Sequence, residues 1–292
     1  MAPLSTKKAK DPLKLLLIGD SGTGKTGALA SLANAGYELF ILDLDNGTDI
    51  LNFVVKDEFK KNVHIETLTD TGKMSGSGTS QKIIKLNPQA FPKALSLLQK
   101  WKDSETGEDF GPVSSWGTSR ILVVDSLSFL GMAALDYVLA KNGRGGEQPF
   151  QADWGEAMRM LEQTLQIIYS TEIKCHVVMN SHITYQQVEG SGITKGLPMG
   201  LGSQLPPKIG RYFNMMLMTK SQGQGDSTKR LILTKPAASV EVKCPILNAP
   251  KELPIESGLA DIYKLWGLEA PAGSSPPATG STNFNRPLNA KS

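Results

Sequence analysis

The chain has 292 residues, of which 40% are hydrophobic and 20% charged, a composition typical of a globular protein with a sizeable core. No apolar run approaches the ~20 residues that span a bilayer, and no apolar segment follows the basic residues after Met1. We therefore expect a cytoplasmic protein without a membrane partner. The formal net charge of +3 is too small to indicate nucleic-acid binding by itself.

The two ends of the chain differ in composition from its middle. Residues 1–11 are polar, basic and without periodicity, which predicts a flexible arm. Residues 269–292 are rich in Pro, Gly, Ser, Thr and Asn, which predicts a disordered tail. Between them, residues 12–268 alternate strand and helix patterns. This alternation predicts one α/β domain with a mostly parallel sheet covered by helices on both faces.

The first motif lies between an apolar run at 15–18 and a helix pattern at 28–33. It matches G-x-x-x-x-G-K-[ST], the phosphate loop in which backbone N–H groups and a helix N-terminus surround a nucleotide phosphate. Lys25 would reach the β- and γ-phosphates, and the Thr26 hydroxyl would bind Mg²⁺. The cofactors predicted are therefore ATP and Mg²⁺. The predicted nucleotide-binding residues are Gly19, Asp20, Ser21, Gly22, Thr23, Gly24, Lys25 and Thr26.

Two acids follow the second predicted strand, residues 39–43. Ligands of open parallel sheets bind outside the carboxyl ends of the strands, so Asp43 or Asp45 can hold the attacking water as general base. Side chains alternate along a strand, and we expect both to point the same way. A polar loop that caps the next helix is an equally good interpretation.

Another acid closes the apolar run at 121–124. A buried carboxylate is costly unless it is paired, so Asp125 is best explained as a magnesium-side ligand. No glutamate follows it, which argues against hydrolases that place their base there and gives more weight to Asp45. The strand predicted at 175–180 ends next to His182, which would contact the γ-phosphate or be an ordinary loop histidine.

The remaining patterns predict further elements and two flexible segments. Residues 142–153 form a Gly-rich flexible segment, and 184–207 form a long loop in which mobile positive charge can meet a phosphate backbone, with a disordered insertion as the alternative. Predicted strands are 63–68, 213–219, 230–234 and 240–242, helices are 89–102, 127–140, 154–170 and 259–266, and loops are 69–80 and 103–119.

In the order of these parts the chain resembles the RecA-like P-loop ATPase core, and most closely the phage-encoded single-strand annealing and recombination ATPases, over roughly residues 13–242. The resemblance implies antiparallel strands at the C-terminal side of the sheet. It makes Asp45 the catalytic carboxylate, where the family usually carries glutamate. It also makes Asp125 the magnesium-site acid and His182 the γ-phosphate sensor, which is glutamine in bacterial recombinases.

The same resemblance implies a site shared between subunits of a filament or ring. Lys235 would reach the γ-phosphate of a neighbouring subunit, unless it is an ordinary solvated lysine at a strand end. The two flexible segments fall where the family keeps its DNA-binding loops. The DNA-binding candidates are Lys141, Arg144, Lys195 and Lys208.

The function expected from these features is ATP-dependent binding of single-stranded DNA during recombination or annealing, with ATP hydrolysis at subunit interfaces. The partners implied are single-stranded DNA, further copies of the chain and a single-strand-binding protein, for a phage protein in the cytoplasm of a bacterial host. Three alternatives stay open: an AAA-type remodelling or loader ATPase, a small-molecule phosphotransferase, and a non-catalytic module that assembles under nucleotide control.

Overall fold

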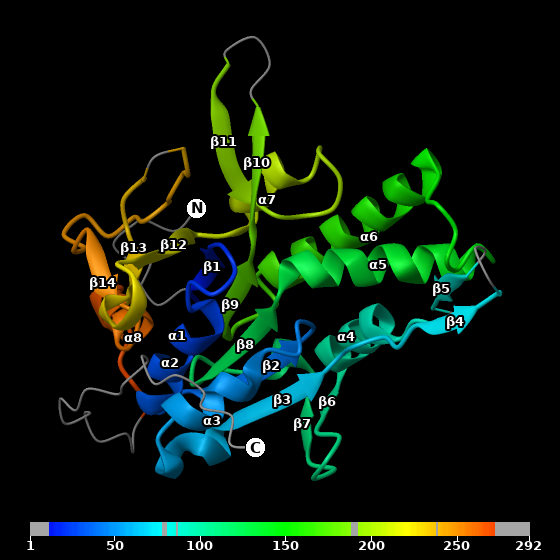
Figure 1. The fold of residues 1–292 in the computed structure, drawn as a ribbon. Coiled ribbons are helices and arrows are strands. Elements are labelled where there is room, and N and C mark those ends of the chain that lie inside the picture. The colour runs from blue at the N-terminus through cyan, green and yellow to red at the C-terminus, as the bar shows by residue number, and fades with distance from the viewer. Residues whose placement is uncertain (1–11, 78–80, 86, 188–191, 238, 272–292) are drawn as a thin grey trace, which may run out of the picture.

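The computed structural model describes residues 12–77, 81–85, 87–187, 192–237 and 239–271 (Figure 1). Within these ranges eight strands form one sheet in the order β14-β13-β12-β1-β9-β8-β2-β3. Their bounds are β1 Lys14–Ile18, β2 Glu38–Asp43, β3 Val63–Thr67, β8 Arg120–Asp125, β9 His176–Ser181, β12 Met215–Gln222, β13 Lys229–Leu233 and β14 Glu252–Pro254.

The sheet is parallel from β12 to β3 and antiparallel from β12 to β14. Its central strands β1 and β9 are buried along their whole length because helices cover both faces of the sheet. β9 lies between β1, which leads into the phosphate loop, and β8, which ends at Asp125. This arrangement confirms the expected RecA-like core with antiparallel strands at its C-terminal side.

Two hydrophobic clusters, one on each face, hold the helices to the sheet. Along β1, Leu16 and Ile18 face one cluster with α4, α5 and α6, whereas Leu15 and Leu17 face the other with α2, α3 and α8 (Figure 1). The helix bounds are α1 Lys25–Ala28, α2 Ala30–Asn34, α3 Leu51–Val54, α4 Ala90–Gln99, α5 Leu127–Lys141, α6 Gln151–Tyr169, α7 Pro206–Ile209 and α8 Gly258–Leu265.

Three two-stranded hairpins overlap the predicted loops. These pair β4 Lys73–Ser75 with β5 Lys82–Ile84, β6 Trp101–Lys102 with β7 Asp109–Gly111, and β10 Ile183–Gln187 with β11 Thr194–Pro198. The last hairpin overturns the prediction of an irregular loop at 184–207, and it projects from the carboxyl edge of the sheet (Figure 1). Strands such as β4 and β10 bury little on either face, so their sequences lack the apolar periodicity by which strands are recognised.

Smaller differences concern single elements. The predicted strand at 240–242 makes only isolated bridges, and β14 replaces it as the partner of β13. The helix predicted at 89–102 ends at Gln99, which leaves the buried Trp101 in β6. The predicted arm at 1–11 and most of the predicted tail, 272–292, lie outside the described residues. In the described part of the chain, no helix has the length and apolar character needed to cross a membrane.

Candidate functional site

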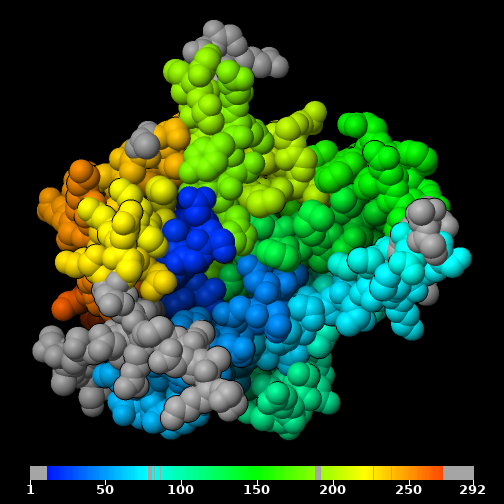
Figure 2. All heavy atoms as spheres, in the orientation of Figure 1, coloured from blue at the N-terminus to red at the C-terminus, as the bar shows by residue number. Residues whose placement is uncertain are grey.

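The phosphate loop runs from the end of β1 into α1, and its glycines are required by its geometry. A Cβ at Gly19 would collide with the hydroxyls of Thr219 and Thr23, and Gly24 has a φ of +95° that side chains disfavour. In Figure 2 the dark blue segment that contains this loop reaches the surface between the yellow strands β12 and β13 and the lighter blue β2 region. The loop is therefore shaped by its neighbours and open to a nucleotide.

Lys25 is buried and turns back over the loop. Its Nζ donates to the carbonyl oxygens of Gly19 and Asp20, each at 2.9 Å. Burial lowers the pKa of Lys25, while the carboxylates of Asp125, Asp45 and Asp20 raise it. The two carbonyl oxygens bind the Lys25 ammonium group, which is expected to bind the phosphate oxygens of a nucleotide in their place.

Thr26 and Asp125 meet where a magnesium ion is expected. The Thr26 hydroxyl donates to Asp125 Oδ2 at 2.7 Å, and Asp125 is 1% exposed at the end of β8. Burial raises the pKa of Asp125 to about 6, against the hydrogen bond from the Thr26 hydroxyl, which lowers it. A carboxylate this deeply buried next to a hydroxyl forms a site that a cation would stabilise.

Asn180 supports the same interpretation. It lies beside Asp125 on the adjacent strand β9, and its fully buried amide has no hydrogen-bond partner among the described residues. Buried amides are normally hydrogen-bonded, so this one fits a water shell around a bound ion. The hydroxyl, carboxylate and amide oxygens here are the ligand types that Mg²⁺ prefers. The described residues contain no group of three or more His, Cys, Asp or Glu that could hold a metal without a nucleotide.

The two acids after β2 have different environments. Asp43 is buried, and its carboxylate accepts from the Gly47 N–H at 3.3 Å and the Thr48 hydroxyl at 2.7 Å. Asp45 lies beyond the end of the strand, where its side chain is 20% exposed and accepts from the Ser126 hydroxyl at 2.8 Å. Because Asp45 lies outside β2, strand alternation does not fix the direction of its side chain relative to Asp43. Asp45 is the more exposed of the two acids, and its role as the base stays a prediction.

His182 follows β9 directly and faces Asp45. Its Nε2 lies 3.5 Å from Asp45 Oδ2, and its backbone N–H donates to Ser128 Oγ at 3.1 Å. The His182 carbonyl accepts from the N–H of Met199, which closes the base of the β10–β11 hairpin at 2.7 Å. The predicted sensor residue thus links the candidate base to the hairpin.

Arg230, on β13, lies against the phosphate loop. Its Nε donates to the Gly22 carbonyl at 3.0 Å, and its Cδ packs over Gly24. Lys235 follows two residues after the end of β13 and is half-buried. Its role at a neighbouring subunit's site stays a prediction.

The four DNA-binding candidates differ in their surroundings. Lys141 and Lys195 form exposed ion pairs with Glu156 and Glu241, both at 2.7 Å, and Lys208 is exposed on α7. Such surface pairs contribute little to stability and can exchange for phosphate. Arg144 instead binds the buried carboxylate of Asp153 and stacks on Phe150. Removing it would leave a buried charge unpaired, so Arg144 stabilises the α5–α6 turn.

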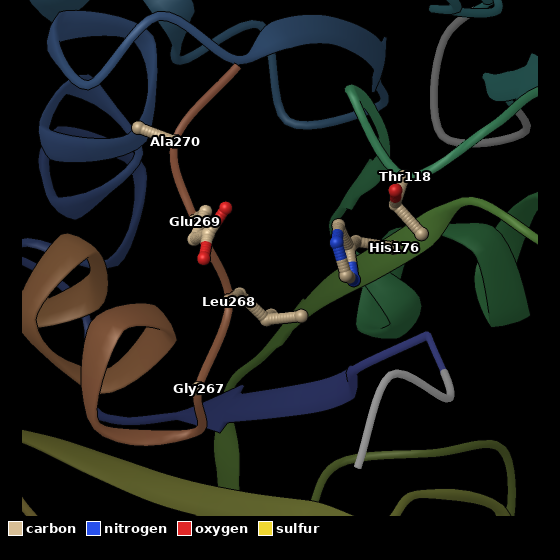
Figure 3. Close-up of a pocket in the computed structure, with 6 residues that line it drawn as sticks. All are labelled: Thr118, His176, Gly267, Leu268, Glu269 and Ala270. Carbon is tan, nitrogen blue, oxygen red and sulfur yellow. The ribbon is translucent and has the colours of Figure 1, made fainter. Parts of the chain in front are cut away.

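A second hollow of about 240 Å³ lies at the opposite end of the sheet, between His176 and the segment after α8 (Figure 3). His176 Nδ1 accepts from the Leu13 N–H at 2.9 Å, and burial lowers the pKa of the imidazole to about 4. The ring is therefore neutral at pH 7 and joins the amino ends of β1 and β9. No residue predicted for the nucleotide site lines this hollow.

Several residues at the site were not predicted from the sequence. Thr219 on β12 shares a hydrogen bond with Thr23, Ser126 and Ser128 contact Asp45 and His182, and Arg230 braces the loop. Ser126 follows Asp125 directly and Ser128 comes two residues later, so their closeness to a predicted site residue was a usable signal. Thr219 and Arg230 come from distant strands and carried none.

Comparison with known proteins gives one family and several distant structures. The sequence profile of the family described as AAA domain matches residues 11–245. The RadB recombinase structure is 12% identical, with a TM-score of 0.41 over 78% of this chain and 85% of the other. The structure of the flagellar accessory protein FlaH from Methanocaldococcus jannaschii is 12% identical, with a TM-score of 0.40 over 83% of this chain and 84% of the other. That of a KaiC-like protein from Pyrococcus horikoshii OT3 is 13% identical, with a TM-score of 0.41 over 84% of this chain and 85% of the other. No curated protein matches the sequence.

Proposed function

The chain belongs to the AAA domain family, and on that premise we propose that it is an ATPase that binds single-stranded DNA and hydrolyses ATP between subunits of an oligomer. The observation that carries the proposal is the convergence of Lys25, the Thr26–Asp125 pair and Asp45 at the carboxyl edge of a parallel sheet. These are the groups that phosphoryl transfer to water requires at one place.

In the proposed reaction, water attacks the γ-phosphate in line with the bond to ADP. Asp45 orients the water and accepts its proton, and Lys25 leaves its carbonyl contacts to neutralise phosphate charge. Mg²⁺ held by Thr26 and Asp125 would neutralise further charge on the β- and γ-phosphates. Lys235 of a neighbouring subunit would approach from the other side.

The β10–β11 hairpin is the proposed contact for single-stranded DNA. Tyr185 is 53% exposed on β10, and Lys195 lies on the paired strand β11, opposite Gln186. Exposed aromatic rings stack on bases, and lysines bind the phosphate backbone. Because the hairpin closes at His182 and Met199, DNA bound there would act on the site through His182.

Two alternative functions fit these observations less well. A loader ATPase of the AAA+ type would need a C-terminal helical lid, whereas in the described residues β12 is followed by two antiparallel strands and the short helix α8. A phosphotransferase would need a lid with arginines near the acceptor, and residues 184–207 contain none.

The test is the rate of ATP hydrolysis by the full chain with and without single-stranded DNA, with Lys25→Ala as the control for contaminating activity. We expect Mg²⁺-dependent turnover that single-stranded DNA stimulates and that salt suppresses together with DNA binding. Equal turnover with and without DNA, and no salt-sensitive DNA binding, would refute the DNA part of the proposal. Electron microscopy with ATP and DNA tests for a filament or ring.

A further inference from the structure

Ser126 has the sequence position of a helix cap but does not act as one. It is the residue before α5, where serine hydroxyls usually accept a hydrogen bond from the first turn of the helix. Here the side chain makes no capping bond, and its hydroxyl donates to Asp45 Oδ1 at 2.8 Å. Ser126 is fully buried, so a hydroxyl directed away from the helix needs a different explanation.

The backbone of Asp45 is already held by the residue that precedes Ser126. The N–H groups of Leu44 and Asp45 both donate to the carbonyl of Asp125, at 2.6 and 3.3 Å. The carboxylate is held more weakly on its other side, since His182 Nε2 lies 3.5 Å from Oδ2, beyond hydrogen-bond distance. Ser126 therefore makes the one hydrogen bond to the Asp45 carboxylate among the described residues.

We propose that Ser126 is a positioning residue that sets the direction of the Asp45 carboxylate toward the attacking water. The inference rests on the proposed function, in which Asp45 is the base. Asp45 is partly exposed, so without a partner its carboxylate would rotate among several orientations. One carboxylate oxygen of Asp45 is bound to Ser126, which leaves the other oxygen for the attacking water. The same hydrogen bond ties the base to the segment that carries Asp125, the acid on the magnesium side. Small errors in the position of a catalytic group cost large factors in rate.

The test measures turnover and nucleotide affinity of the full chain in two matched pairs. The first pair compares the unchanged protein with Ser126→Ala, and the second compares Ser126→Thr with Ser126→Val. The second pair has nearly the same shape and differs in the hydroxyl group, so it separates positioning from packing in a site without spare room. We expect Ser126→Ala to lower kcat about tenfold or more while the Kd for ATP stays within about twofold, because the hydroxyl contacts the base and not the phosphate loop. Ser126→Thr should turn over ATP several times faster than Ser126→Val.

Two further variants separate this inference from the proposed function. Ser31→Ala removes a buried hydroxyl that accepts from the Ala260 N–H far from Asp45, and it should lower stability without changing kcat. Asp45→Asn should abolish most turnover. If Asp45→Asn is impaired but Ser126→Ala is not, or if the Thr and Val variants are equal, the positioning role is wrong and the proposed ATPase stands. If Asp45→Asn retains full turnover, or the unchanged protein has none, the proposed mechanism fails and the inference fails with it.

Discussion

The two acids that lie opposite each other on β2 and β8 show how neighbouring carboxylates acquire different properties. Asp43 and Asp125 are paired in register, and both are 1% exposed. Asp43 is satisfied by two local donors from the turn after β2. Asp125 has one hydroxyl donor, and its burial raises the pKa to about 6, so its charged form is the less satisfied of the two.

This difference predicts how Asp125 affects stability. Because the pKa of Asp125 rises from 3.8 in the unfolded chain to about 6 in the folded one, the native state binds more protons between these values and loses stability as the pH rises through them. At 1.36 kcal/mol per pH unit the loss is on the order of 2–3 kcal/mol. Asp125→Asn should remove this loss, so the nucleotide-free variant should be the more stable protein at pH 7.5 and should lack Mg²⁺-dependent turnover.

Urea denaturation at pH 4.5 and pH 7.5, with a chelator present, measures this prediction. Asp57→Asn is the control, because Asp57 is an exposed surface carboxylate whose loss should leave the pH dependence unchanged. An unaltered difference between the two pH values in Asp125→Asn would show that another group is responsible.

At the scale of elements, the short C-terminal strand β13 completes the phosphate loop. Its Arg230 bonds to Gly22 and covers Gly24, and β12 beside it supplies Thr219 against Thr23. The loop sequence was recognisable on its own, but its support was not. Thr219 and Arg230 are about 200 residues away from the loop in sequence, and only the sheet brings β12 next to β1 and β13 next to β12.

We expect Arg230→Ala to raise the Kd for ATP roughly three- to tenfold, since a hydrogen bond of this kind contributes about 0.5–1.5 kcal/mol. Titration with a fluorescent ATP analogue measures the effect. Lys229→Ala is the matched control, because Lys229 is the exposed neighbour of Arg230 on the same strand. Equal affinities of the two variants would contradict a bracing role for Arg230.

The three hairpins are elements that the sequence did not predict. The segments at 69–80, 103–119 and 184–207 were predicted as loops because polar, Gly-rich sequence carries no strand periodicity. In the β10–β11 hairpin the pairing depends on its two ends, which His182 and Met199 hold together at the site. The structure therefore changes the form of this segment from a loop to a hairpin, and its contact with DNA stays a prediction.

At the scale of the whole molecule, the proposed function requires a site shared between subunits. Arg230 lies on the phosphate loop of its own chain, and Lys235 lies beyond the opposite end of the same strand. The strand would then join two neighbouring nucleotide sites. A heterologous contact of this kind repeats from subunit to subunit and forms a ring or a filament.

Mixing two inactive variants tests this arrangement. Lys235→Ala keeps its own Asp45, and Asp45→Asn keeps its own Lys235, so a site formed between one of each contains both groups. An equal mixture should regain turnover, roughly a quarter of the unchanged protein's rate if the subunits mix at random. Each variant should still bind ATP alone. A mixture no more active than its parts would place Lys235 outside the neighbour's site.

The sequence by itself determined the phosphate loop, the acids at the strand ends and the alternation that produces a parallel sheet, because each depends on residues a few positions apart. Only the tertiary structure decided which acid after β2 is bound to Ser126, which cations are paired, and which distant strands close over the loop. Those properties depend on strand order and on contacts between segments far apart in the chain. Local sequence patterns carry no information about such contacts, because the same local pattern is compatible with many different strand orders.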